Sequence, residues 1–344
     1  MVSLIDVENS LDNKNLPVGH ELKLLKDFRL IFKDKMEILA GKKYIQKLGG
    51  QGTQLPCSLC SGKHSYNGFK ILFNYFISLV LARGDILLFI DTPEQLLWGI
   101  ALFKGKRKII SITYLQWDKY ISKYISNNCI RRFLVERGLK HLDGCIVTNS
   151  VYTPEIPFVR VPDYYITDEI IKYQNSIKKR GCVCLGEIRP EKDIVGLVRV
   201  IRKTPLFLFI AGSFQDENIY QKVNRIKTEN IKIENKNLSY DTYIKYLSEY
   251  KYVILPYDPM YYNIKTSGVL LEAIFLGAVP VAPRNILEQN RIQGLGYSTI
   301  SEIPNLIYLY EEGKIEVKNN LDQYQYGNYK SRILKFINHI IHYS

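Results

Sequence analysis

The chain of 344 residues carries 47 Lys and Arg against 34 Asp and Glu, a formal net charge of +13, and 46% of its residues are hydrophobic. This length suits two domains of ordinary size, and the composition is that of a globular protein rather than a disordered or fibrous one. The longest apolar runs, such as residues 71–82, hold about a dozen residues, fewer than the roughly 20 of a membrane-spanning helix.

The N-terminus and the cysteines indicate the compartment. Asp6 and Glu8 stand where a secretory signal has a basic start and an apolar core. The six cysteines are scattered, which favours a reducing compartment. Cys57 and Cys60, with His64 nearby, form only half of a zinc-binding pattern. We therefore expect a cytoplasmic protein without a bound metal or other cofactor.

Strand-like and helical runs alternate in the first half of the chain. We expect strands over 2–8, 36–41, 85–91, 107–114 and 144–149, and helices over 20–32, 66–83, 93–103 and 117–140. Basic residues are in excess here, with 23 Lys and Arg against 15 Asp and Glu in residues 1–165, including the cluster at 104–108. Such an excess attracts phosphate-rich partners, although a solvated lysine-rich surface explains each cluster equally well.

Three prolines within ten residues interrupt the pattern, and we place a linker near 160–178. Beyond it we expect strands over 181–188, 206–212, 231–235, 252–257 and 278–282. Helices are expected from Pro190, over 217–226 and 239–250, after Gly268, and over 326–344. Ile194, Leu197 and Val198 lie on one face of the helix after Pro190, as in a helix that packs on a sheet.

This alternation predicts an α/β protein built from two Rossmann-like domains with parallel sheets. The predicted domains are 1–165 and 166–325, and the helix of 326–344 is expected to cross back to the first domain. Two such domains facing each other form a cleft at the carboxyl ends of their strands, where open α/β sheets bind ligands. Phosphate is the expected ligand group, because helix N-termini present unpaired N–H groups.

One helix start combines a polar step with a single carboxylate. Thr266 or Ser267 can cap the helix, and Gly268 permits a ligand to approach the backbone. Glu272 follows inside an apolar run, roughly 6–8 Å along the helix from the cap, and a carboxylate can accept from two vicinal ribose hydroxyls. The alternative is a buried Glu that is satisfied by the backbone or by a neighbouring Lys.

A second candidate site follows the strand of 181–188. Arg189 and Lys192 lie three residues apart around Pro190, close enough to face one anion at the start of a helix. Cations at such a position can stabilise a leaving diphosphate. An ordinary surface pair of basic residues is the alternative.

These segments resemble the donor domain of GT-B glycosyltransferases, in particular the retaining family 4. Residues 185–192, "LGEIRPEK", are similar to the family's GRLxPEKG segment, and 206–213, "LFLFIAGS", to its glycine-containing strand. Residues 267–283, "SGVLLEAIFLGAVPVAP", are similar to its most specific signature. The resemblance covers roughly residues 180–285.

The resemblance implies a nucleoside diphosphate sugar as donor and a role for each matching residue. Lys192 would contact the diphosphate and Glu272 the ribose, while the segment of 236–240 would lie against the nucleobase. The other implied donor-binding residues are Gly212, Asn237, Leu238, Thr266, Ser267, Gly268 and Val269. Glu187 stands where the family has an Arg, so we take Arg189 as its replacement, and Ile264 stands where the family has a sugar-binding acid.

In the first half the resemblance is fainter. It would put Gly19 and His20 at the cleft, with Gly19 on the donor and His20 in catalysis. Asp91 occupies the place of a catalytic His and is followed by Glu94. Asp91 could serve as base if the enzyme inverts or orient the sugar if it retains, and capping or turn roles are the alternative for both residues. We interpret the glycine-rich residues 49–54 as a flexible acceptor-side loop.

The sequence thus predicts a metal-independent hexosyltransferase acting on a glycan or lipid-linked glycan, in the assembly of a bacterial surface polysaccharide or glycan. A lipid-linked acceptor would place the protein peripherally at the anionic inner face of the membrane. A sugar-nucleotide 2-epimerase of the same fold is one alternative. A basic nucleic-acid-binding protein is another, although the chain has no recognisable DNA or RNA module and we expect no nucleic-acid partner.

Overall fold

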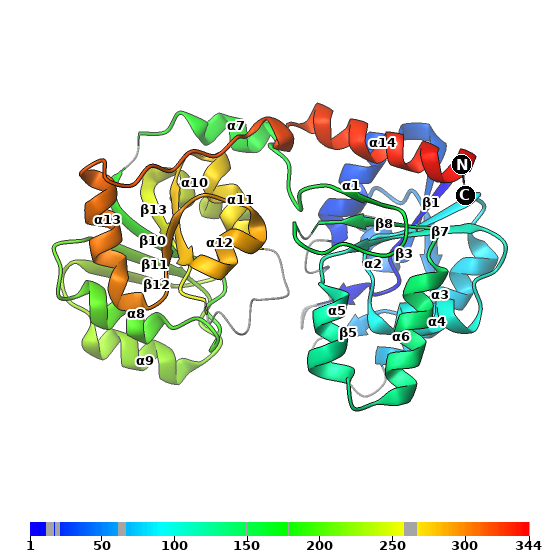
Figure 1. The fold of residues 1–344 in the computed structure, drawn as a ribbon, viewed down its shortest axis with the longest axis horizontal. Coiled ribbons are helices and arrows are strands. Elements are labelled where there is room, and N and C mark those ends of the chain that lie inside the picture. The colour runs from blue at the N-terminus through cyan, green and yellow to red at the C-terminus, as the bar shows by residue number, and fades with distance from the viewer. Residues whose placement is uncertain are drawn as a thin grey trace. The chain divides into compact units, whose positions relative to one another are not determined.

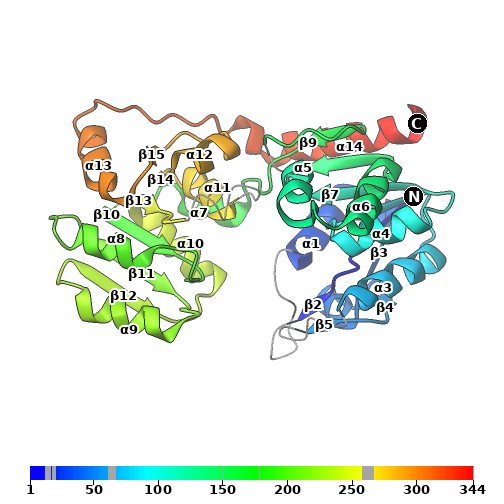
Figure 2. The ribbon, with the colours of Figure 1, turned by 60° about the horizontal axis from the view of Figure 1, so that its bottom comes forward.

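The structure, a computed structural model, describes residues 1–11, 17, 21–60, 67–148, 150–177, 179–257 and 267–343. The chain divides into two compact units, which are drawn in Figures 1 and 2. Unit 1 consists of Met1–Val161 together with Tyr329–Ser344, and unit 2 consists of Pro162–Asn328. Each unit is an α/β domain with its own parallel sheet.

Unit 1 contains a seven-stranded sheet in the order β4-β3-β1-β6-β7-β8-β9, and all of its neighbours are parallel. In chain order the strands are β1 (Val2–Ile5), β3 (Met36–Gly41), β4 (Thr53–Leu55), β6 (Ile86–Phe89), β7 (Lys108–Thr113), β8 (Gly144–Val147) and β9 (Phe158–Arg160). A separate parallel pair joins β2 (Ser10–Leu11) to β5 (Leu59–Cys60).

The described helices of unit 1 are α1 (Glu21–Phe32), α2 (Lys42–Lys47), α3 (Asn67–Leu81), α4 (Glu94–Leu102), α5 (Trp117–Tyr120), α6 (Cys129–His141) and α14 (Tyr326–Tyr343). The last of these returns to unit 1 after the chain has built unit 2. Phe336 and Ile340 of α14 lie close to Gly144, where a side chain larger than hydrogen would meet them.

Unit 2 contains a six-stranded parallel sheet in the order β12-β11-β10-β13-β14-β15. Its strands are β10 (Lys179–Leu185), β11 (Leu208–Gly212), β12 (Ile231–Asn235), β13 (Tyr250–Ile254), β14 (Val279–Pro283) and β15 (Leu295–Tyr297). Its described helices are α7 (Asp168–Gln174), α8 (Ile194–Ile201), α9 (Glu217–Ile226), α10 (Tyr240–Glu249), α11 (Gly268–Phe275), α12 (Arg284–Asn290) and α13 (Ile303–Glu311).

The sheet of unit 2 is buried on both faces. Val183 and Leu185 of β10 belong to one apolar cluster with α10 and α11, while Cys182 and Cys184 belong to another with α8. Successive side chains of a strand point to opposite faces, so this division gives each face of the sheet its own helical layer. The prediction of two parallel-sheet α/β domains is therefore confirmed.

Three expected elements differ from the structure. The helix expected from Pro190 begins at Ile194, because the Asp193 side chain accepts the backbone N–H of Gly196 and caps it there. The expected helix over 117–140 is interrupted, since the Asn128 side chain caps α6. The expected linker contains α7, and Ile170 is packed in the core of unit 2.

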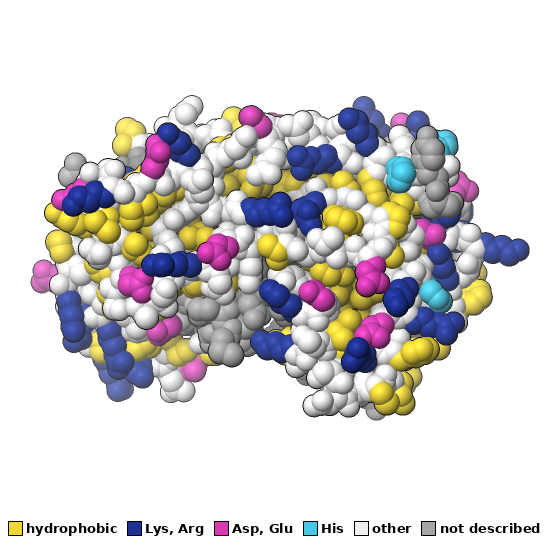
Figure 3. All heavy atoms as spheres, viewed as in Figure 1, with side chains coloured by type: hydrophobic (Ala, Val, Ile, Leu, Met, Phe, Trp, Pro, Cys, Tyr) yellow, Lys and Arg dark blue, Asp and Glu magenta, His cyan; other side chains and the backbone are white. Residues whose placement is uncertain are grey.

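The expected loop of 49–54 also differs, because its last residues begin β4. Lys and Arg side chains are spread over the visible face of both units rather than gathered on one (Figure 3). None of the helices that the structure describes combines the length and the apolar composition needed to span a bilayer.

Candidate functional site

The strand order of unit 2 reverses between β10 and β13. From β10 the sheet continues to β11 and β12, and from β13 it continues to β14 and β15 in the opposite direction. In open α/β sheets the crevice at the carboxyl ends of two such strands is the usual ligand site. The segments that follow β10 and β13 therefore form the candidate ligand site of unit 2.

Lys192 lies in the segment after β10 and is buried. Its Nζ donates to the carbonyl oxygen of Leu185 at 3.3 Å and lies 5.8 Å from the ring centre of Tyr257, which follows β13. A backbone bridge also joins Lys192 to Tyr257. Burial lowers the pKa of Lys192, because the charged ammonium loses hydration.

Arg189 is in a different situation from Lys192. Its guanidinium is about half exposed and forms an ion pair with Glu187, with Nε 2.5 Å from a carboxylate oxygen. The other oxygen of Glu187 accepts from the side chain of Gln215. Arg189 is thus held beside Glu187, the residue that stands at the family's Arg position.

The helix α11 starts at the same edge of the sheet. Ser267 is its N-cap residue, but the Ser267 side chain makes no capping hydrogen bond. Its Oγ instead lies 3.2 Å from the hydroxyl of Tyr257, and its backbone N–H donates to the Asn290 side chain at 3.3 Å. Tyr257 therefore connects Lys192 with the start of α11.

Gly268 and Val269 form the first turn of α11. A Cβ on Gly268 would lie 2.6 Å from the ring of Tyr164, so the absence of a side chain is already required by protein packing. The other predicted residue at this helix start, Thr266, lies outside the described residues, as does Ile264.

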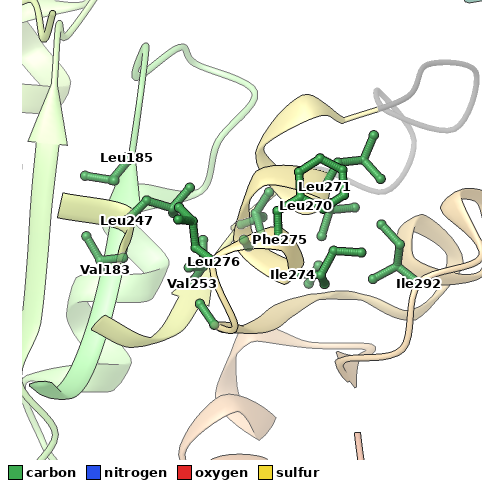
Figure 4. Packing of buried hydrophobic residues seen from close by; sticks show 14 of the residues in the cluster. Val183, Leu185, Leu247, Val253, Leu270, Leu271, Ile274, Phe275, Leu276 and Ile292 are labelled. Carbon is green, nitrogen blue, oxygen red and sulfur yellow. The ribbon is translucent and has the colours of Figure 1, made fainter. Parts of the chain in front are cut away.

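Glu272 lies one turn further along α11 and is buried. The hydroxyl of Tyr243 donates to its Oε2 at 2.7 Å, and the hydroxyl of Tyr240 approaches its Oε1 at 3.4 Å. Burial and the neighbouring Glu272 raise the pKa of Tyr243 well above its usual value, so this hydroxyl stays protonated as a donor. The apolar side chains around Glu272 on α11 pack into the core, as Figure 4 shows for Leu270, Leu271 and Ile274.

Glu272 is thus a buried carboxylate with tyrosine partners, whereas the alternative interpretation expected the backbone or a Lys. The two tyrosines do not contact it equally. Tyr243 is partly buried and its hydroxyl is close to the carboxylate, whereas Tyr240 is 45% exposed and its hydroxyl is further away.

The remaining predicted donor residues lie on neighbouring elements. Leu238, between β12 and α10, packs against the core that contains α11, while Asn237 beside it is exposed. Gly212 ends β11, and a Cβ there would lie 1.8 Å from the carbonyl oxygen of Gly186. Gly212 thus allows the segment after β10 to pass close to β11.

Unit 1 has its own reversal of strand order, between β1 and β6. Asp6 and Glu8 follow β1, and Asp91 follows β6. Burial and, after it, the nearby carboxylate of Glu8 raise the pKa of Asp91 well above its usual range. Burial also raises the pKa of Asp6 to about 7 and that of Glu21, at the start of α1, to about 8. We call Asp6, Glu8, Glu21 and Asp91 the carboxyl cluster.

The hydrogen bonds of the carboxyl cluster are incomplete. One oxygen of Asp6 accepts the backbone N–H groups of Glu8 and Asn9 at 3.0 and 3.1 Å. The other oxygen of Asp6 and one oxygen of Glu21 are buried without a hydrogen-bond partner among the described residues. The predicted Gly19 and His20 lie outside the described residues.

Glu94 does not join the carboxyl cluster. It is buried in α4, where Arg131 of α6 binds both of its oxygens at 2.8 and 2.7 Å and Tyr120 donates to it at 3.0 Å. A pocket of about 600 Å³ lies near this pair, lined by Trp117, Arg132 and Tyr152 among others, and none of the predicted site residues lines it.

The sequence prediction missed five residues of these two groups. Tyr243 donates to Glu272 and Tyr257 lies against Ser267, while Asp6, Glu8 and Glu21 belong to the carboxyl cluster with Asp91. Tyr240, whose hydroxyl approaches Glu272, lies in the predicted segment of 236–240. A signal for two of the carboxylates was available, because Asp6 and Glu8 lie at the end of the strand predicted over 2–8. Tyr243 and Tyr257 gave no comparable signal among the 26 tyrosines in the chain.

Comparison with known proteins finds similarity in structure only. No protein-family model matches the sequence, and no curated protein matches it either. A glycosyltransferase from Rickettsia africae superposes with a TM-score of 0.63 at 12% identity, covering 99% of both chains. Sucrose-phosphate synthase from Thermosynechococcus elongatus gives 0.62 at 13% identity, covering 98% of this chain and 95% of the other.

The chain has the GT-B fold. The structural neighbours also include the UDP-GlcNAc 2-epimerase of Methanocaldococcus jannaschii, with a TM-score of 0.58 at 12% identity over 98% of this chain and 100% of that one. At this level of identity the similarity defines the architecture, and the chemistry has to be argued from the site.

Proposed function

We propose that this protein is a metal-independent glycosyltransferase that moves a hexose from a nucleoside diphosphate sugar to a hydroxyl of a glycan or lipid-linked glycan. The proposed setting is the assembly of a bacterial surface polysaccharide or glycan in the cytoplasm, at the anionic inner face of the membrane when the acceptor is lipid-linked. The GT-B neighbours that are named as a glycosyltransferase and as a synthase support this reaction class.

The single observation that carries the proposal is the connection of Lys192 to the start of α11 through Tyr257. A buried ammonium and a helix start without a side-chain cap lie at one switch point. Both attract an anion, and a diphosphate has the charge and the acceptor oxygens for both. In this proposal Lys192 and the N–H groups of Gly268 and Val269 bind the diphosphate and stabilise it as it leaves.

Glu272 is proposed to bind the ribose. Its Oε1 is approached by the hydroxyl of the partly exposed Tyr240 at 3.4 Å, and a carboxylate can accept from two vicinal ribose hydroxyls. Tyr243, at 2.7 Å, would keep the carboxylate in place. The rings of Tyr240 and Tyr243 lie 6.4 Å apart at 26°, and together with Asn237 and Leu238 they are the proposed surroundings of the nucleobase.

The carboxyl cluster of unit 1 is proposed to bind the acceptor. A carboxyl whose pKa is raised by burial is a stronger base than an exposed one, and Asp91 is the proposed base for an inverting reaction. In a retaining reaction the same residue would orient the acceptor. Arg189, exposed beside Glu187, is proposed to assist the diphosphate after this ion pair opens.

A nucleotide panel tests the donor site. UDP, GDP, ADP and dTDP are added separately, and the melting temperature of the protein is measured with each. At least one should raise it, and Glu272→Gln should abolish the shift. Glu311→Gln is the matched control. Glu311 also accepts a hydrogen bond from a tyrosine, Tyr252 at 2.5 Å, but it lies on α13 and not on α11. If none of the nucleotides raises the melting temperature of the wild type, the donor assignment is wrong.

A sugar-nucleotide 2-epimerase is the second candidate, favoured by the epimerase among the structural neighbours. An epimerase converts the nucleotide sugar without any acceptor, whereas a transferase transfers the sugar to an acceptor. Incubation with the nucleotide sugar alone separates them: formation of an isomer of the donor would replace the transferase proposal.

A further inference from the structure

Helix α3 of unit 1 is apolar on two opposite faces. Its inner face contributes Ile71 and Tyr75 to the core of unit 1. Its outer face carries Phe69, Phe73, Phe76 and Val80, spaced four, three and four residues apart. At 3.6 residues per turn these four side chains form one stripe, roughly 16 Å long.

The outer stripe is open to solvent. Phe69 is 76% exposed, Phe73 50% and Val80 77%. Large aromatic side chains at such exposure are unfavourable in water, and a row of them marks a surface that binds something else.

Two more exposed apolar residues lie at the end of the neighbouring helix α4. Leu102 and Phe103, at the end of α4, are 65% and 58% exposed. The Tyr75 hydroxyl of α3 donates to the carbonyl oxygen of Phe103 at 2.7 Å, which fixes this turn beside the helix. Figures 1 and 2 both draw α3 next to α4. We call the six residues Phe69, Phe73, Phe76, Val80, Leu102 and Phe103 the α3 face.

The charges around the α3 face are mainly positive, with Asp85 and Asp143 as acidic neighbours. Residues 67–84 and 95–108 contain no Asp or Glu, and they contain six basic residues: Lys70, Arg83, Lys104, Lys106, Arg107 and Lys108. Arg107 donates to the carbonyl oxygen of Leu79 at 2.9 Å and so ties the basic turn to α3. Lys104 and Lys108 are paired with Asp143, while Arg83 and Lys106 are exposed.

We infer that the α3 face is a docking surface for an anionic lipid membrane. Aromatic and aliphatic side chains on one helix face can enter the headgroup region, while lysines and arginines around them bind anionic headgroups. A second copy of the chain fits less well, because two such faces would bring their positive charges together. The inference adds to the proposed function a surface that would bring the protein to a lipid-linked acceptor. It rests on the proposed function only for this purpose, because binding to a membrane can be measured without the reaction.

Flotation with lipid vesicles tests the inference on the full chain. The wild type should float with vesicles of phosphatidylethanolamine and phosphatidylglycerol at low salt, and much less with vesicles of phosphatidylcholine alone. The double variant Phe69→Ser, Phe73→Ser should lose at least about tenfold in binding to the anionic vesicles. The double variant Arg83→Gln, Lys106→Gln should weaken binding and reduce its dependence on salt.

The matched control carries the same kind of change in unit 2. Ile171 and Tyr308 are 49% and 58% exposed on α7 and α13, and the variant Ile171→Ser, Tyr308→Ser should bind vesicles like the wild type. All variants replace exposed side chains, so an unchanged melting temperature is expected and verifies that each has folded.

Two results would overturn the inference: a wild type that does not bind anionic vesicles at low salt, or stripe variants that bind vesicles normally and change the sedimentation coefficient instead. The second result would make the α3 face an interface between copies. A protein that binds vesicles through this face but no nucleoside diphosphate would leave the docking surface standing and remove only the proposed reaction.

Discussion

Lys192 is a buried cation in unit 2. Its side chain contacts a backbone carbonyl and the ring of Tyr257, and it forms no ion pair with any of the described residues. A buried charge without an opposite charge lowers the stability of a protein. In the proposed function a bound diphosphate supplies the opposite charge.

Replacing Lys192 should therefore affect stability and binding in opposite ways. Lys192→Met is expected to leave the free energy of unfolding unchanged or to raise it by about 1–2 kcal/mol. Its affinity for the nucleoside diphosphate should fall about 100-fold, while the affinity for the nucleoside alone should change little. Calorimetric titration measures both, with the exposed Lys222→Met as control. Equal losses for the nucleoside and its diphosphate would contradict a role at the phosphates.

The carboxyl cluster makes the stability of unit 1 depend on pH. Burial raises the pKa of Asp6 to about 7 and that of Glu21 to about 8, so the folded state holds protons that the unfolded state has released. Stability is then fully present below about pH 4 and is lost as the pH rises through about 7 to 8. A carboxylate that is ion-paired in the folded state has a lowered pKa instead, and its contribution to stability would increase as the pH rises.

Asp6→Asn tests this origin of the pH dependence. The amide oxygen can still accept the N–H groups of Glu8 and Asn9, but the titration is gone. The melting temperature of the wild type should fall between about pH 5 and about pH 8, and that of Asp6→Asn should fall less. The exposed Asp34→Asn serves as control. Parallel curves for wild type and Asp6→Asn would show that another group is responsible.

At the residue scale, sequence reasoning found the charged residues but not their partners. Lys192 and Glu272 stand in recognisable motifs, so their positions near strand and helix ends could be expected. Tyr243 meets Glu272 only because α10 packs beside α11, and Asp6 and Asp91 are 85 residues apart in sequence. Such proximities depend on the tertiary fold and have no local pattern.

At the scale of elements, Gly212 shows how tightly β11 and the segment after β10 are packed. Its φ of +153° is unfavourable for a side chain, and a Cβ would meet the Gly186 carbonyl oxygen at 1.8 Å. Gly212→Ala should lower the free energy of unfolding by about 2–4 kcal/mol and weaken nucleotide binding, because the segment carrying Lys192 has to move.

A second glycine separates the two causes. Gly277 also has a positive φ, +69°, but nothing lies within 4 Å of an added Cβ. Gly277→Ala should cost only about 1 kcal/mol, from backbone strain alone, and leave nucleotide binding intact. Chemical denaturation of both variants gives the comparison. A cost for Gly212→Ala no larger than that for Gly277→Ala would mean that the close approach to Gly186 relaxes freely.

The long elements could be predicted because each buries a regular apolar pattern. The alternating residues of β10 and the face of Ile194, Leu197 and Val198 on α8 are examples. The short strands β9 and β15, of three residues each, are below the length at which a pattern can be recognised. The start of α8 was misplaced because Pro190 is a common first residue of helices, whereas Asp193 provides the actual cap.

At the scale of the whole molecule, the chain is two units joined by a returning helix. Ile340 of α14 is fully buried against unit 1, while its neighbour Ile341 is about half exposed. Ile340→Ala should destabilise unit 1 by about 2–4 kcal/mol and leave the nucleotide response of unit 2 unchanged. Calorimetry with and without nucleotide measures this, with Ile341→Ala as control. Loss of the nucleotide response in Ile340→Ala would contradict a donor site contained in unit 2.

The most direct test of the proposed reaction starts from the donor. The protein is incubated with a mixture of nucleotide sugars and a glycan acceptor pool, and mass spectrometry identifies which nucleotide sugar disappears and what is formed. The account predicts that one nucleoside diphosphate is released while an acceptor gains the mass of one hexose residue, and that Glu272→Gln and Lys192→Met abolish both changes. A mixture that stays unchanged with the wild type, or an acceptor that gains mass equally with both variants, would contradict it.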